Sequence, residues 1–201
     1  MKKHDLLQSI AQRSYDVGFG AKKHFATFDI IEKIPGWIGF LSISFGIFSL
    51  AHSNLPSQLM SAIFVVLGVV SLYVSFYAQQ KQEYEGAGKA LTKLFYELKT
   101  LYLTVKRLQE TDDFTDVKVK LSDIETRFFP NCISKQILFS NWLAHYKFFW
   151  ELQIDWLDEE LHFSFMRDKM PLSLWLVLLT TTFSSIIWGF DLFLWICSVA
   201  A

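Results

Sequence analysis

The chain has 201 residues, which is enough for one domain or for a small domain with a membrane part. Hydrophobic residues make up 52% of it and charged residues 19%, whereas a soluble domain usually carries about 25% charged residues. The net charge of −1 provides no bulk attraction to nucleic acid, so we expect no nucleic-acid partner.

Residues 1–33 are mixed and charged. Their apolar side chains recur at roughly helical spacing, as at Leu6 and Ile10. Gly18 and Gly20 weaken the middle of the pattern. We predict an N-terminal cytosolic amphipathic helix over residues 1–33, straight or bent at the glycines, that leads into the membrane.

No charged residue occurs between Ile34 and Gln80. Two apolar runs in this span are separated by a polar break at His52–Pro56, which contains turn formers. A helix needs about 20 residues to cross the hydrocarbon core of a bilayer. The sequence therefore predicts a two-transmembrane hairpin over residues 34–78. The alternative, a buried hairpin in a soluble protein, would have to hide an unusually long uncharged stretch.

Residues 79–170 are predicted to form a cytosolic helical domain. Over residues 79–109 there is no proline, and the apolar residues fall three and four apart, so we expect a long helix that continues the second span. A shorter helix is expected to begin near Thr115 or Asp116, with Asp116 as a candidate cap, and to close at Pro130.

Residues 134–168 are predicted to form the last helix of this domain. Trp142, Phe149 and Trp156 recur at heptad spacing, with further aromatic residues between them. Three interpretations stay open: the core of an antiparallel pair with the 79–109 helix, an oligomer or partner interface, and a shallow contact with the membrane surface. These three aromatic residues are our candidates for the interface.

A third apolar stretch runs from Pro171 to Ala201, with Asp191 as its single charge. The stretch is longer than one span requires. Either residues 172–190 cross the membrane and the tail lies in the far interface, which we favour, or the crossing part begins later. In the second case Asp191 lies inside the membrane, where an ionisable residue is presumed functional. Both predict a third transmembrane segment at 171–201.

The basic residues indicate the orientation. They precede the hairpin or lie between Lys81 and Lys169, and none occurs in the hairpin loop or after Lys169. The positive-inside rule therefore places the N-terminus in the cytoplasm and the C-terminus outside. We predict a multi-pass, all-α membrane protein of the bacterial inner (plasma) membrane, with a transmembrane helical hairpin, a cytosolic helical bundle and a third C-terminal transmembrane helix.

Small residues form stripes at helical spacing on the apolar segments. Such stripes allow close approach in lipid, where the hydrophobic effect does not drive helices together. They indicate either packing within one hairpin or packing between subunits, with the serines facing a pore. The candidates for helix packing or pore lining are Gly39, Ser42, Gly46, Ser49, Gly68, Ser71, Ser75, Ser184 and Asp191.

No catalytic constellation is recognisable. Glu159 and His162 have the spacing of half of a carboxylate di-metal site, but the second half is missing. No Gly-rich phosphate loop follows a predicted strand. We therefore expect no catalytic residue, no metal and no cofactor, and the protein is not expected to be an enzyme.

Several loosely placed features resemble a known family. They are Arg13 in a basic first helix, the uncharged hairpin Ile34–Ala78, a long helix that opens Gln79-Gln80-Lys81-Gln82-Glu83-Tyr84 and continues through Leu91 and Tyr96, and a return with Asp123, Ile124, Arg127 and Pro130. Over residues 5–170 they resemble the SLATT family, the SMODS- and SLOG-associating two-transmembrane effector domains of bacteria. The third apolar segment departs from the family's two-span pattern.

The resemblance implies a membrane effector in a nucleotide-triggered conflict system. We expect a homo-oligomer in the lipid bilayer that forms a pore or disrupts the inner membrane, as in anti-phage defence by abortive infection. Its trigger is expected to be a nucleotide second messenger or a partner from a nucleotidyltransferase system. The alternative is a non-conducting membrane scaffold that recruits a cytosolic partner through the aromatic segment 134–168.

Overall fold

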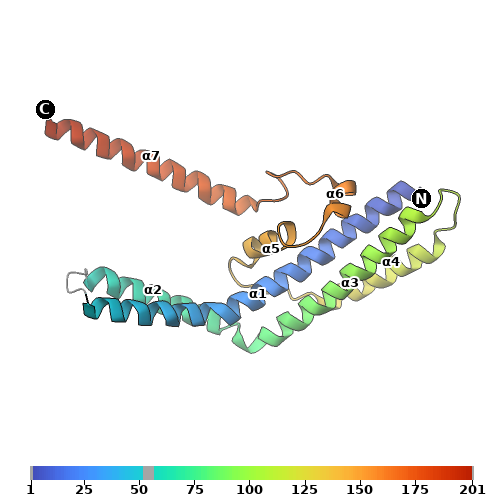
Figure 1. Ribbon diagram of the computed structural model, residues 1–201, viewed down its shortest axis with the longest axis horizontal. Helices are drawn as coiled ribbons and strands as arrows, with labels where there is room; N and C mark the ends of the chain where they lie inside the picture. Colours follow the sequence, from blue (N-terminus) through green and yellow to red (C-terminus); the bar gives the residue numbers. More distant parts are fainter. Residues whose placement is uncertain (1, 52–56, 201) are drawn as a thin grey trace. The chain divides into compact units, whose positions relative to one another are not determined.

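The computed structural model describes residues 2–51 and 57–200, and the side-chain surroundings of residues 2–51 and 58–188. Every regular element in these residues is helical, as predicted (Figure 1). The predicted hairpin loop at His52–Pro56 lies outside the described residues. The elements are α1 Lys3–Ala51, α2 Ser57–Ser75, η1 Ala78–Gln80, α3 Lys81–Arg107, α4 Thr115–Phe128, η2 Phe129–Asn131, α5 Ser140–Phe149, α6 Asp155–Leu161 and α7 Leu172–Ala200.

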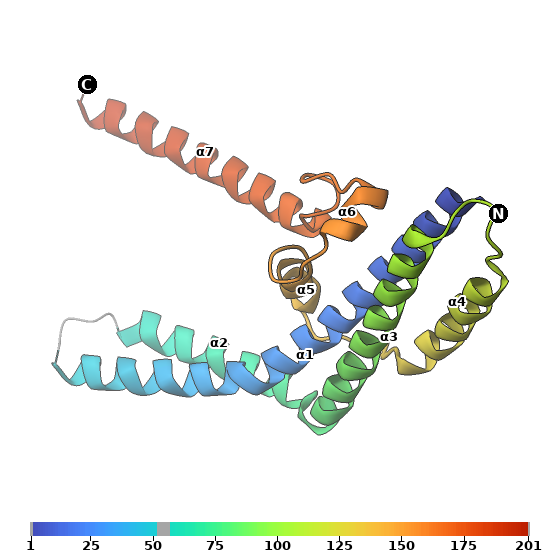
Figure 2. The same cartoon turned by 45° about the vertical axis from the view of Figure 1, so that its right-hand side comes forward.

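The chain divides into two compact units, Met1–His162 and Phe163–Ala201, which are described separately. In the first unit, α1 is a single helix of 49 residues with Pro35 inside it. A proline inside a helix removes one backbone hydrogen bond and crowds the preceding turn, which bends the helix. Figure 2 shows α1 changing direction between the part beside α3 and the part beside α2. The predicted N-terminal helix and the first predicted span are thus one element.

The second helix of the hairpin, α2, returns along the second half of α1 and ends at Ser75 (Figure 1). The prediction that it continues directly into the next helix is wrong. A turn closed by the Tyr77 N–H to Val74 O bond, 3.0 Å, and then η1 separate α2 from α3. Tyr77 is buried at this point, so the chain turns around an anchored aromatic side chain.

The core of the first unit lies between α3 and the N-terminal half of α1. The two run antiparallel, and Lys3 Nζ near the start of α1 donates to Leu108 O just after α3, 2.6 Å away. The spacing of three and four residues puts the apolar side chains of α3 on one face. The fully buried side chains of this core include Leu6, Ile10, Val17, Tyr84, Leu91, Leu98, Tyr102 and Val105.

Gly18 of α1 lies where this helix packs closely against α3 and α5. A Cβ atom there would lie 2.7 Å from Cδ2 of Phe95 in α3 and 2.9 Å from Cε2 of Phe148 in α5. Both rings are buried. Gly18, which the sequence suggested as a weak point in the helix, is therefore the position that lets α1 pack against α3 and α5 together.

The shorter helix α4 packs on α3 through Val117, Leu121 and Ile124, which are buried as the sequence pattern indicated. It begins at Thr115, but the predicted cap is wrong. Asp113 accepts the Thr115 N–H at 2.9 Å, while Asp116 lies inside the first turn.

The predicted helix over 134–168 is wrong, because the structure divides this segment into α5, α6 and the non-helical stretches around them. Its buried side chains are Ile137, Ala144, Phe148, Ile154, Trp156 and Leu157. At 100° per residue they point in all directions around a straight helix, so a single helix would leave several of them in water. Breaking the helix buries all of them.

The second unit consists of α7 and the non-helical residues before it. Pro171 precedes the helix, as predicted, and α7 begins at Leu172. Within the unit, Nε1 of Trp175 donates to Met166 O at 3.1 Å. Over the described part, residues 172–188, most side chains are exposed.

Candidate functional site

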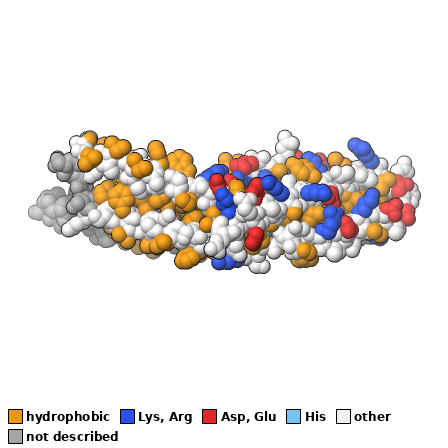
Figure 3. All heavy atoms as spheres, turned by 90° about the horizontal axis from the view of Figure 1, so that it is seen from below, with side chains coloured by type: hydrophobic (Ala, Val, Ile, Leu, Met, Phe, Trp, Pro, Cys, Tyr) orange, Lys and Arg blue, Asp and Glu red, His pale blue; other side chains and the backbone are white. Residues whose placement is uncertain are grey.

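The hairpin has the length and the exposure of a membrane-embedded structure. α1 and Gln58–Ser75 contain 18-residue windows with mean hydropathy of 1.6 and 2.0, of which 0% and 6% is buried. The core helices of a soluble protein are mostly buried, so the hairpin is not such a core. On the face that Figure 3 shows, charged side chains gather over the bundle and hydrophobic ones over the hairpin. The described part of α7, Leu172–Trp188, is a shorter apolar helix, and the third span stays a prediction.

Five of the predicted small residues of the hairpin fall into two groups. Ser42 and Ser71 are half-buried, whereas the residues next to them in the sequence are exposed. A Cβ atom added to Gly39, Gly46 or Gly68 would meet no atom within 4 Å. These three glycines, which we call the glycine flank, therefore make no close helix contact inside the hairpin.

The remaining described candidates lie on three different apolar helices and are exposed. Ser49, Ser75 and Ser184 are exposed, and Ser75 Oγ donates to Leu72 O of its own helix at 2.7 Å. Asp191 lies outside the described side chains.

An apolar cluster joins the hairpin to the bundle. It consists of Ile31, Val74, Tyr77, Tyr84 and Ile137, which are all buried, and we call it the joint. Its members come from α1, the end of α2, the turn after it, α3 and the segment before α5. The joint therefore connects the membrane helices with three later parts of the chain.

The segment before α5 crosses this joint as a non-helical strap, residues 132–139. Because it belongs to neither a helix nor a sheet, its backbone groups need other partners, and side chains of the hairpin and bundle supply several. Tyr84 Oη donates to Lys135 O at 2.6 Å, Tyr77 Oη donates to Gln136 O at 3.5 Å, Leu138 N donates to Tyr73 Oη at 3.1 Å, and Ile133 N donates to His24 Nε2 at 2.9 Å.

Sequence reasoning missed the strap, because it placed residues 134–139 in a helix. One pattern was available. Tyr73 and Tyr77 lie at the end of an apolar run and Tyr84 follows seven residues later, and these intervals of four and seven are the spacing of one helical face.

The imidazole of His24 is buried beneath the strap and is held in one tautomer. Nε2 accepts the Ile133 N–H, so the proton is on Nδ1, which lies 2.6 Å from Gly20 O. Burial lowers the pKa of His24 below its ordinary value of 6.5, and the positive charge of Lys23 lowers it further, against the opposing effect of the Gly20 bond. The neutral ring is therefore the form that fits this structure.

The three candidate interface aromatics are packed to different degrees. Trp156 is buried in the core of the first unit, with its ring centroid 4.9 Å from that of Tyr102. Phe149 is half-buried beside Phe148, and the Trp142 ring lies 5.1 Å from that of Phe139. Packing inside the chain accounts for Trp156, and an intermolecular role of the other two stays a prediction.

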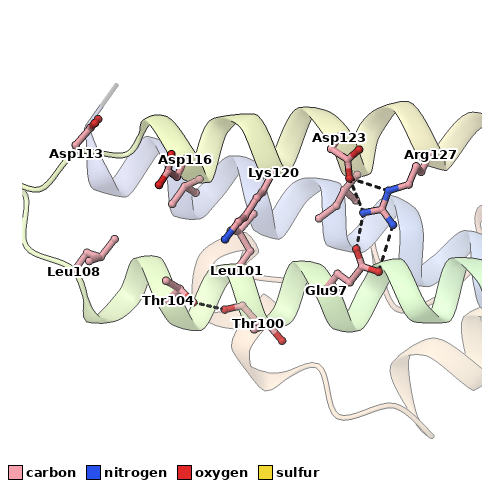
Figure 4. Close-up of a pocket in the computed structure, with 12 residues that line it drawn as sticks. Glu97, Thr100, Leu101, Thr104, Leu108, Asp113, Asp116, Lys120, Asp123 and Arg127 are labelled. Carbon is pink, nitrogen blue, oxygen red and sulfur yellow. Dashed lines mark hydrogen bonds and ion pairs between the residues drawn. The ribbon is translucent and has the colours of Figure 1, made fainter.

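A groove of about 540 Å³ lies between α3 and α4 (Figure 4). Arg127 reaches across it, with Nη2 2.5 Å from Glu97 Oε2 and 2.8 Å from Asp123 Oδ2. The hydrogen bond from Arg127 lowers the pKa of Glu97. The lining contains four carboxylates, including Asp113 and Asp116, and two cations. Its charge suits a cationic ligand better than a nucleotide phosphate.

The pair Glu159 and His162 makes no metal site. The Glu159 carboxylate is bonded to Lys106 and to the Tyr102 hydroxyl, and His162 ends α6 in a left-handed conformation. In the part of the chain that the structure describes, no group of three His, Cys, Asp or Glu side chains is placed to hold an ion.

An exposed apolar hairpin that shares its first helix with a charged bundle indicates a membrane protein, and two of its described helices are long and apolar enough to cross a bilayer. A comparison with protein families confirms the predicted resemblance. The chain belongs to the family described as SMODS and SLOG-associating 2TM effector domain 6, whose model matches residues 1–178. The family name describes a two-transmembrane effector domain. No curated protein and no solved structure matches the chain.

Proposed function

We propose that this protein is the membrane effector of a bacterial nucleotide-triggered, anti-phage defence system. Copies of the chain assemble through their hairpins and form a pore or disrupt the inner membrane, with the bundle in the cytoplasm. The lysine and arginine distribution supports this orientation, and membership of a family of 2TM effector domains supports the class of function.

The observation that carries the proposal is the glycine flank. Gly39, Gly46 and Gly68 face no atom of their own hairpin within Cβ contact distance. In lipid, small residues promote association because they let two backbones approach closely. These open glycine positions would therefore suit another copy of the hairpin, and a change in the bundle that favours the assembled state would act as the trigger.

The experiment uses the full chain in liposomes of bacterial phospholipid with a trapped dye, with and without added cyclic di- and trinucleotides. The same chain is expressed in bacteria exposed to a membrane-impermeant dye. Gly46→Leu should abolish leakage because it fills the flank. Ser44→Leu is the matched control, because Ser44 is exposed on another side of α1, and it should leak like the unaltered chain. Intact membranes in both systems at full expression would remove the proposal.

Exposed aromatic side chains support a second candidate, a non-conducting scaffold. Tyr146 and Trp150, on and beside α5, are 55% and 63% exposed, and exposed aromatics are typical of protein interfaces. A scaffold would retain a cytosolic partner at the membrane, lose it on Tyr146→Asp, and release no dye with either hairpin variant. Dye release that depends on Gly46 would exclude it.

A further inference from the structure

The tip of the strap turns two large apolar side chains outward. Leu138 is 61% exposed and Phe139 is 56% exposed, although Ile137 before them and Ser140 after them are buried. The turn depends on an uncommon backbone conformation, since Phe139 has φ of 66°. A bulky side chain in the left-handed region is strained and persists only where the surroundings hold it. The fold thus holds Phe139 in a strained backbone conformation, and this conformation exposes the apolar side chains of the tip.

The tip lies at the level of the last turn of a transmembrane helix. The Leu138 N–H donates to the hydroxyl of Tyr73 at 3.1 Å, and Tyr73 belongs to the apolar helix Gln58–Ser75. Tyrosine and tryptophan are enriched where a span meets the headgroups. The hydrogen bond therefore fixes the tip at the boundary between hydrocarbon and water.

The surroundings of the tip favour lipid over water. Leu72 and Phe76, on either side of Tyr73 in the sequence, are 64% and 73% exposed, so the exposed apolar surface of the span extends to the tip. Trp142 adds a second ring, whose centroid lies 5.1 Å from that of Phe139. The strap also carries Lys135 and no acidic residue, which suits the phosphates of anionic headgroups.

We propose that Leu138 and Phe139, with Trp142 beside them, form a lipid anchor that enters the interface of the bilayer spanned by the hairpin. The anchor holds the strap, and with it the joint, against the membrane surface. It rests on the membrane location of the hairpin and not on pore formation, so the dye-release experiment and the experiment below can fail separately.

The test places an environment-sensitive fluorophore on single cysteines of the full chain in liposomes. Cys132 and Cys197 are first replaced by serine, and the labels are then attached in Leu138→Cys and Phe139→Cys variants. Both labels should emit at shorter wavelength than a label exposed to water. They should be quenched by lipids brominated near the top of the acyl chain and protected from quenching by aqueous iodide. Val119→Cys on α4 is the control, since Val119 is 64% exposed on the bundle. Its label should be quenched by iodide.

A second variant tests the anchor without stressing the fold. Phe139→Gly removes the ring, and glycine adopts the left-handed conformation without the penalty of a Cβ atom. It should make the Leu138→Cys label several-fold more accessible to iodide. Iodide quenching of both tip labels equal to that of the Val119 label would overturn the proposal. Protection from both quenchers, or emission that changes with the protein-to-lipid ratio, would identify a protein contact and overturn it as well.

Discussion

Two glycine-to-alanine substitutions with opposite expected signs test the packing of the bundle. Both Gly18 and Gly86 lie inside helices, where alanine is favoured over glycine by about 1 kcal/mol. At Gly86 a Cβ atom meets nothing within 4 Å, so Gly86→Ala should gain this amount. At Gly18 the Cβ atom would lie 2.7 Å from Phe95 and 2.9 Å from Phe148. Overpacking a core costs about 1–3 kcal/mol, so Gly18→Ala should be neutral to destabilising by about 2 kcal/mol.

The difference between the two variants is the quantity to measure. At roughly 2–4 °C per kcal/mol for a chain of this size, Gly86→Ala should melt about 2–4 °C higher than the unaltered chain. Gly18→Ala should melt about 2–12 °C below Gly86→Ala, from an overpacking cost of about 1–3 kcal/mol. The assay is the apparent melting temperature of the detergent-purified chain by intrinsic fluorescence at one scan rate. If the two variants melted together, the close approach of α1 to α3 and α5 would be refuted.

Three further predictions concern the bundle. Leu157→Ala removes a fully buried side chain and should cost about 2–5 kcal/mol, seen as a lower melting temperature; an equal loss for the partly exposed Leu103→Ala would contradict this. His24 has a lowered pKa, so the folded chain binds fewer protons than the unfolded chain. The contribution of neutral His24 to the free energy of unfolding should be fully present above pH 6.5. It should be lost as the pH drops from 6.5 towards the lower pKa of His24 in the folded chain. His24→Gln should flatten this slope in melts at successive pH values, and an unchanged slope would contradict it. A double-mutant cycle on Arg127 and Glu97 should give a coupling free energy of about 0.2–1 kcal/mol that declines as the salt concentration rises, since both side chains are partly exposed. A coupling free energy that does not change with salt would contradict a screened ion pair.

The parts of the structure that follow from local pattern were predicted well. The uncharged stretch after Ile34 indicated the hairpin, and the spacing of apolar residues indicated the buried faces of α3 and α4. In these segments each residue's environment depends on neighbours three or four positions away, so the sequence is sufficient.

The parts that depend on distant contacts were not predicted. Trp142, Phe149 and Trp156 are seven apart, and a heptad pattern describes a straight helix. The structure instead breaks this segment into α5 and α6, because its buried residues contact α1 and α3 from several directions. The strap is missed for the same reason, since its partners His24 and Tyr84 lie far away in the sequence. The three glycines were predicted as members of two small-residue stripes, one on each helix of the hairpin, but only the structure separates them from the half-buried Ser42.

One helix belongs to both halves of the first unit, and this has a mechanical consequence. At about 1.5 Å per residue, the 49 residues of α1 form a rod of about 74 Å, bent near Pro35. A rotation of the part beside α3 would carry Gly39 and Gly46 with it, because no loop between the two parts of the helix intervenes to absorb the motion. In the proposed assembly, a movement of the bundle would thus reorient the glycine flank directly, without a separate linker to carry the motion.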